Sequence, residues 1–139
     1  MANGTIAFDT LQTSGQISGT ARSLDTDFVV NGSAKHWINF TGESTPTVRD
    51  SLNTGSITDN GTGDFTNAYT NSFNTAQAYT AGGQVAHSGA TTTSYCCQPY
   101  SDTTIATAST RYSILYNTAS AVGVADYDYA ATTNHGDLA

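Results

Sequence analysis

The sequence predicts an all-β protein, and three observations lead to this fold class. Turn-forming residues recur at short, regular intervals, and no stretch sustains the apolar period of a long helix. Eight Tyr and five Phe argue against disorder, although Thr, Ser, Asn, Gly and Ala dominate the composition. Leu, Ile and Val are scarce, so one chain buries a thin core. We therefore expect the chain to complete its core by association.

The first 33 residues predict an arm or shaft. Two short extended pieces lie in this part, Ile6–Leu11 and Asp27–Asn31, and the turn sequences "TSG" and "NGS" follow them. Both pieces are too short and too polar to form a domain. We expect residues 1–33 to be an N-terminal attachment arm, and residues 34–139 to form a separate C-terminal head.

The head begins with a clear strand pattern in "KHWINF". Residues alternate along it, so Trp37 lies on one face of the strand and His36, Ile38 and Phe40 lie on the other. Aromatic residues in such strands usually pack inside. We therefore expect Trp37 and Phe40 in the core, and sugar stacking by Trp37 is the alternative.

A β-hairpin follows. The extended stretch "TVRDSLNTGSITDN" is expected to carry a bulge at Gly55, and "NGTG" supplies a turn in which Gly61 and Gly63 permit positive φ. The chain returns through "DFTNAYT", which places Phe65 and Tyr69 on one face. Both are expected in the core.

Four further segments complete the head. "NSFNTAQAYTAGGQV" has helical spacing, but its Thr and Asn residues are poor helix formers, so we expect a turn and then a strand around 78–86. "GATTTSYCCQPY" starts as a strand and breaks at Pro99, and "TRYSILYNT" and "SAVGVADYDYAATT" alternate. The whole pattern predicts an antiparallel β-sandwich-like head, with a compact antiparallel barrel as the alternative.

The charge balance excludes two classes of partner. Net charge is −7, the isoelectric point is about 4.3, and Lys and Arg together number four. Such a chain neutralises few phosphates, so we expect no nucleic-acid binding, and it offers no basic patch to anionic lipid. The opening "MANGTIAFDT" lacks the basic and apolar regions of a signal peptide, so we expect synthesis in a cytosol without export by that route.

Metal and catalytic motifs are weak. "DNGTGD" resembles a calcium loop, but Gly61 stands at the third ligand position and Thr70 at the twelfth, so a hairpin turn fits better. Cys96 and Cys97 are adjacent, the three His are scattered, and neither set has metal-ligand spacing, so we expect free thiols, no metal and no cofactor. No Gly-x-Ser-x-Gly motif occurs, and we expect no enzyme, although a Ser/His/Asp triad needs no local spacing.

Several segments, in order, resemble a known family. They are "GTIAFDTLQTSGQISGTARSLDTDFVVNGSAKHWINF", "VRDSLNTGSITDNGTGDFT", "AYTAGG" and "DYDYAATTNHGD". Together they are similar to the small tail-fibre proteins of tailed bacteriophages, especially phages of aquatic bacteria. The resemblance is most specific between Ala34 and Thr66 and weakest between Thr80 and Thr110.

The resemblance implies a virion structural protein in the tail, assembled in the host cytoplasm as a homotrimer. Its N-terminal part would attach to a tail or baseplate protein, and its head would bind a host surface glycan or outer-membrane receptor. A trimeric capsid decoration or minor virion protein is the first alternative. A polysaccharide-degrading tail spike is the second.

We expect the receptor-binding residues in the irregular segment "YCCQPY". Tyrosine combines an apolar face with a hydrogen-bonding tip, which suits the recognition of sugars and polar surfaces. Tyr95 and Tyr100 flank this segment, and Gln98 adds an amide between them. These three residues form the predicted recognition site.

Overall fold

The computed structural model describes residues 10–12, 23–25, 29–30, 32–77, 79–86, 94–101 and 104–139. The chain divides into two units, Met1–Ser33 and Ala34–Ala139. In the first unit, β1 (Thr10–Gln12) pairs antiparallel with β2 (Ser23–Asp25). Of the two extended pieces expected in this unit, the first reaches β1 with Thr10 and Leu11, whereas Val29 and Val30 of the second are helical and not extended; their other residues lie outside the described ones.

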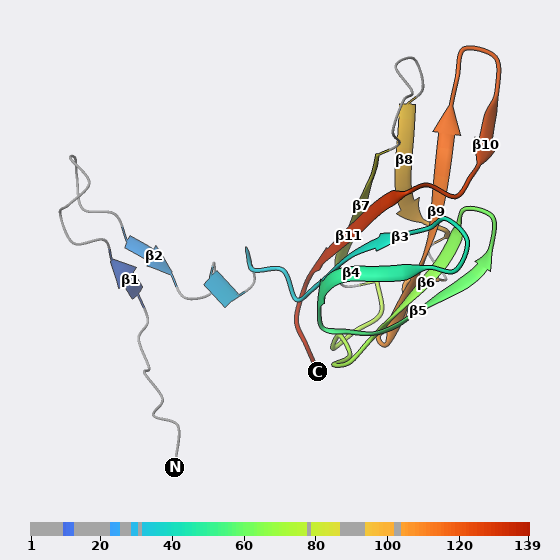
Figure 1. Cartoon of the computed structure of the whole chain (residues 1–139). Coiled ribbons are helices and arrows are strands. Elements are labelled where there is room, and N and C mark those ends of the chain that lie inside the picture. The colour runs from blue at the N-terminus through green and yellow to red at the C-terminus, as the bar shows by residue number, and fades with distance from the viewer. Residues whose placement is uncertain are drawn as a thin grey trace. The chain divides into compact units, whose positions relative to one another are not determined.

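The second unit is a single antiparallel sheet, which confirms the all-β prediction (Figure 1). Its main path runs in the order β4-β3-β11-β7-β8-β9-β6-β5, and β10 pairs with β9. The strands are β3 (His36–Thr41), β4 (Thr47–Leu52), β5 (Thr54–Gly61), β6 (Asp64–Tyr69), β7 (Thr80–Ala86), β8 (Ser94–Pro99), β9 (Ser109–Asn117), β10 (Val122–Val124) and β11 (Tyr129–His135).

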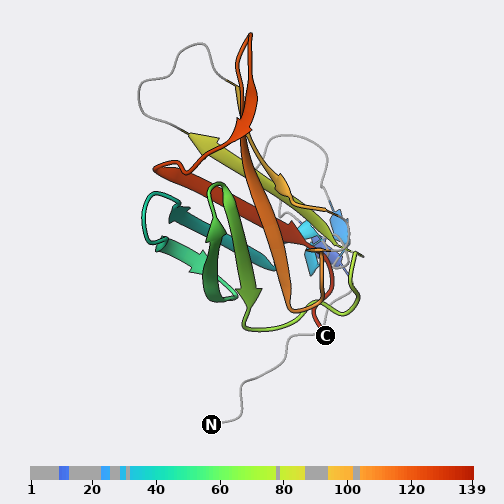
Figure 2. The ribbon, with the colours of Figure 1, turned by 90° about the vertical axis from the view of Figure 1, so that its right-hand side faces the viewer.

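The sheet curves until its two edge strands approach each other (Figure 2). β4 and β5 stand at opposite ends of the strand order, yet Asn53 alone separates them in sequence. At this seam the hydroxyl Oγ1 of Thr54 lies 3.1 Å from Nε2 of His36 on β3. The result is one nearly closed sheet, which is nearer to the barrel alternative than to two separate facing sheets.

The β5–β6 hairpin has the predicted features. Its register shifts between Thr54 and Ser56, which places a bulge at Gly55, and the turn carries positive φ at Gly61 (131°) and Gly63 (64°). A Cβ at Gly63 would lie 2.7 Å from the carbonyl oxygen of Ile114, so this position also needs glycine for space. Both the bulge and the turn are confirmed.

The C-terminal residues pair with the segment that links β6 to β7. Phe73 and Leu138 form an isolated antiparallel bridge. The amide of Asn74 donates to the carbonyl of Asp137 at 2.8 Å, and that of Ala139 donates to Ser72 at 2.9 Å. The expected turn before β7 is therefore held by backbone hydrogen bonds to the chain's last residues.

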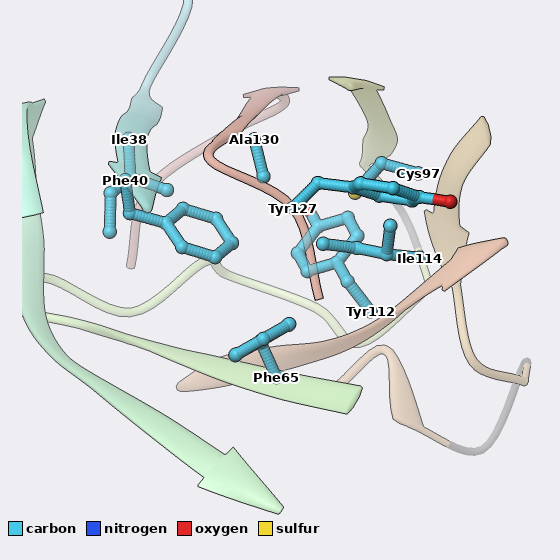
Figure 3. Close-up of a cluster of buried hydrophobic side chains, with 8 residues drawn as sticks. All are labelled: Ile38, Phe40, Phe65, Cys97, Tyr112, Ile114, Tyr127 and Ala130. Carbon is cyan, nitrogen blue, oxygen red and sulfur yellow. The ribbon is translucent and has the colours of Figure 1, made fainter. Parts of the chain in front are cut away.

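Two apolar clusters fill the inside of the sheet. The larger one brings Phe40 and Phe65 edge to face, with ring centroids 5.3 Å apart (Figure 3). Its buried members are Ile38, Phe40, Phe65, Cys97, Tyr112, Ile114, Tyr127 and Ala130. The smaller cluster contains Tyr69, Phe73 and Tyr79, and the rings of Phe73 and Tyr79 stack at 4.1 Å.

Three of the four residues expected in the core, Phe40, Phe65 and Tyr69, are buried. Trp37 is not, because the pleat of β3 points His36, Ile38 and Phe40 inward and Trp37 to the other face, where it is half-buried. The alternation of side chains along β3 determines which face Trp37 occupies, and the large apolar ring does not change this.

A layer of buried polar side chains joins the two clusters. The Nδ2 of Asn134 donates to the hydroxyl of Tyr69 at 2.7 Å, and its Oδ1 accepts from the hydroxyl of Tyr112 at 2.6 Å. The hydroxyl of Tyr69 also lies 2.6 Å from Oγ1 of Thr110, and Asn67 donates to Thr132 at 3.0 Å. These bonds offset the desolvation cost of the buried polar groups.

Candidate functional site

The sequence predicts Tyr95 on an irregular, exposed segment, but the structure places it in a strand. It sits on β8 opposite Tyr116 of β9, and its ring contacts that of Tyr127, with centroids 4.8 Å apart. The side chain is half-buried and packs against the larger apolar cluster. The strand pairing of "SYCCQP" therefore turns the Tyr95 side chain toward this cluster, and Tyr95 also lines a surface groove together with Gln98.

The two cysteines face opposite sides of β8. Cys96 is exposed and Cys97 is buried, and both are free thiols. Burial raises the pKa of the Cys97 thiol to about 12. A Cβ at Gly83 on β7 would lie 2.6 Å from the Sγ of Cys97, so this glycine makes room for the thiol.

Gln98 and Tyr100 are exposed, as expected of recognition residues. The guanidinium of Arg111 lies 4.4 Å from the centre of the Tyr100 ring, and Tyr100 is 53% exposed. The Nε of Arg111 donates to Asp64 at 2.7 Å, and its Nη2 bonds the other carboxylate oxygen. These hydrogen bonds lower the pKa of Asp64, and together with the ring contact they hold Tyr100 in place.

Sequence reasoning missed a hollow on the outer face of β7 and β11. Its volume is about 410 Å³. Gly82 has no side chain, and no atom lies within 4 Å of the position that a Cβ would take there. This residue therefore leaves the bottom of the hollow open. The lining residues are Thr80, Ala81, Gly82, Gly83, Gln84, Ala131, Thr133 and His135. The available signal was the pair of glycines in "TAGGQV", because glycine inside a strand often marks a close approach.

A second groove, of about 290 Å³, lies along β8, β9 and β10. Leu115 and Val122 give it an apolar part, and Gln98 and Asn117 give it amides. Val122 is 69% exposed and Val124 is 47% exposed. The β9–β10 hairpin that carries them projects beyond the rest of the sheet in both views (Figures 1 and 2).

Carboxylates of Asp59 and Asp126 hold the turn in "DNGTGD". Oδ1 of Asp59 accepts the amide of Gly61 at 2.8 Å, and Oδ1 of Asp126 accepts that of Gly63 at 2.7 Å. Within the described ranges, no three His, Cys, Asp or Glu side chains cluster as metal ligands would. His36 is fully buried, which lowers its pKa to about 4 and denies it contact with any substrate.

Among the residues that the structure describes, no helix has the length and apolar character needed to span a bilayer. Comparison with known proteins adds no relative: no family model, no curated protein and no solved structure matches the chain.

Proposed function

We propose that this chain is a bacteriophage tail fibre protein, a homotrimeric structural component of the virion. Residues 1–33 attach it to a tail or baseplate protein, and the domain of residues 34–139 binds a host surface glycan or outer-membrane receptor. The ordered sequence blocks between Ala34 and Thr66 support the family, and their distinctive hairpin is formed in the fold.

The observation that carries the receptor-binding role is the outer face of the sheet. Gln98 and Tyr100 are both exposed and only Pro99 separates them in sequence, and Arg111 and Asp64 hold the Tyr100 ring. An aromatic ring with a fixed position and a free hydroxyl loses little conformational entropy when it binds a polar partner. Adhesion requires an exposed binding surface of this kind, and it requires no catalytic side chain.

The β9–β10 hairpin carries apolar residues that support association between copies of the chain. Val122 and Val124 both have large exposed fractions on this hairpin, and Leu115 lies beside Val124 in the register of the two strands. Contiguous exposed apolar residues mark surfaces that another chain covers. Copies joined here would extend the limited core of each chain, in agreement with its few aliphatic residues.

The molecular mass of the full chain in solution tests the assembly, and adhesion tests the role. By analytical ultracentrifugation we expect a trimer. Labelled protein should adhere to host cells of the virus and, in excess, block infection. A stable monomer would count against the fibre, and a trimer that neither adheres nor blocks infection would favour capsid decoration. Release of sugar from host polysaccharide would favour the degrading spike.

A further inference from the structure

We propose that the hollow over β7 and β11 binds an uncharged sugar unit of a surface glycan. The proposal rests on the proposed function and names a site and a ligand class for it. The site differs from the predicted segment around Tyr95, because it is built by Gly82, Gln84, Thr133 and their neighbours.

The lining of the hollow suits a neutral, hydroxyl-rich ligand. None of its eight residues is Asp, Glu, Lys or Arg. Thr80, Gln84 and Thr133 are exposed and bring two hydroxyls and an amide, and half-buried His135 adds an imidazole. Each of these groups can both donate and accept hydrogen bonds, as sugar hydroxyls do.

The shape of the hollow is set by residues without bulk. The strand register places Thr133 beside Gly82, and Ala131 beside Gln84. Gly82 and Ala131 leave space between the longer side chains that surround them. The volume of about 410 Å³ falls in the range, roughly 300–1,000 Å³, that small-molecule sites occupy.

An aromatic residue stands at one side of the hollow. Thr133 pairs with Gly82 on one flank and with Trp37 on the other, and paired residues point to the same face. Trp37 therefore lies on the outer face, one strand beyond Thr133. The C–H face of a pyranose ring stacks on aromatic rings, so a glycan that enters the hollow can extend over Trp37.

A polar side chain stands at the other side. The pairing of Gly83 with Cys97 places Gln98 of β8 next to Gly82. Gln98 is exposed and on the outward face of β8. The hollow thus lies between Trp37 and Gln98. It connects Gln98, which belongs to the predicted recognition site, with the outer face of β3.

Charge selects against acidic glycans. The net charge of −7 repels sialylated or uronic-acid polymers, and no Lys or Arg lines the hollow. A single sugar in an open site binds weakly. Several copies in one fibre, and several fibres on one particle, convert that weak binding into firm adhesion.

The test uses the full chain on an array of immobilised neutral gluco-, galacto- and manno-oligosaccharides, with sialylated and uronic-acid oligosaccharides beside them. G82I fills the hollow, and T58I adds a methyl-rich side chain to an outward position on distant β5. We expect wild type and T58I to bind neutral glycans, G82I to lose that binding, and Q84A to weaken it. The melting temperature of G82I should not fall, because its Cβ meets open space.

Absence of neutral-glycan binding by wild type, a preference for the acidic glycans, or unchanged binding by G82I would overturn the proposal. Adhesion to host cells separates it from the proposed function. If wild type and G82I adhere equally, the hollow is not the receptor site and the fibre role stands. If wild type does not adhere to cells at all, the fibre role fails, and the array alone decides on the hollow.

Discussion

The Nε2 of His36 lies 3.1 Å from the hydroxyl of Thr54, and this contact bridges the seam between the two ends of the sheet. His36 is fully buried, and its ring stands edge-on to Tyr69 with centroids 4.6 Å apart. A protonated imidazole at this position would be a buried charge beside Thr54, Asn134 and Tyr69, none of which carries a carboxylate. Protonation of His36 at low pH should therefore destabilise the fold at this seam.

Acid should destabilise the domain through His36. Its pKa is about 4 in the folded state against 6.5 in an ordinary environment, so the unfolded chain takes up the proton first. The contribution of neutral His36 to the free energy of unfolding is fully present above pH 6.5. It is lost as the pH drops towards 4, by roughly 3 kcal/mol in all. Urea unfolding at pH 7.5, 6 and 4.5 measures this loss.

The variant H36Q is the control for that titration. It should be less stable than wild type at pH 7.5 but should show a flatter profile between pH 6.5 and 4.5. The pKa of Asp64 is already below its usual value, so its own contribution is lost at lower pH than this window. An equal slope in H36Q would assign the acid sensitivity to other groups.

Two glycines should respond in opposite directions to alanine. At Gly63, a φ of 64° and backbone atoms at 2.7 and 2.9 Å from the new Cβ make G63A costly, by about 2 kcal/mol or more. At Gly82 the space is open and φ is ordinary for a strand, so G82A should stabilise the fold by about 0.5 kcal/mol. Chemical denaturation of both variants compares them; equal effects would contradict the turn geometry.

Removal of the Tyr69 hydroxyl should weaken the polar layer. Asn134 donates to this hydroxyl, and Thr110 and Tyr79 bond it too, so Y69F leaves buried groups without partners at a cost of about 1–3 kcal/mol. Y100F makes the same chemical change at an exposed ring and should stay within about 0.5 kcal/mol of wild type. Thermal unfolding of both proteins gives the comparison, and a neutral Y69F would mean that the layer adds no stability.

Charges on the β9–β10 hairpin should break the assembly. The double variant V122D/V124D places two carboxylates on the surface that we propose other copies cover, so its sedimentation coefficient should fall to that of a monomer. V48D alters an exposed valine on β4 and is the matched control. An oligomer that survives V122D/V124D and dissociates in V48D would move the interface to β4.

The β5–β6 hairpin could be predicted in detail from local chemistry. Gly61 and Gly63 supply positive φ, Gly55 makes a bulge, and alternation puts Phe65 and Tyr69 inside. Each of these features depends on a few neighbouring residues. That is why the sequence alone was sufficient here.

The interior could not be predicted in the same way, because several inward positions are polar. His36, Asn67 and Asn134 are buried by partners distant in sequence, and polarity alone would place them outside. Trp37 shows the reverse: its size favours the core, and the pleat turns it outward. The hollow depends on the register of β7 with β11, which local sequence does not determine.

The opposed directions of Cys96 and Cys97 give the chain a built-in labelling site. Maleimide reagents attack thiolates that solvent can reach, and Cys97 is buried with a pKa of about 12. Under mild conditions only Cys96 should react, and no cysteine needs to be engineered. A gold cluster or fluorophore attached there would let electron or light microscopy find the protein on a particle or on a cell surface.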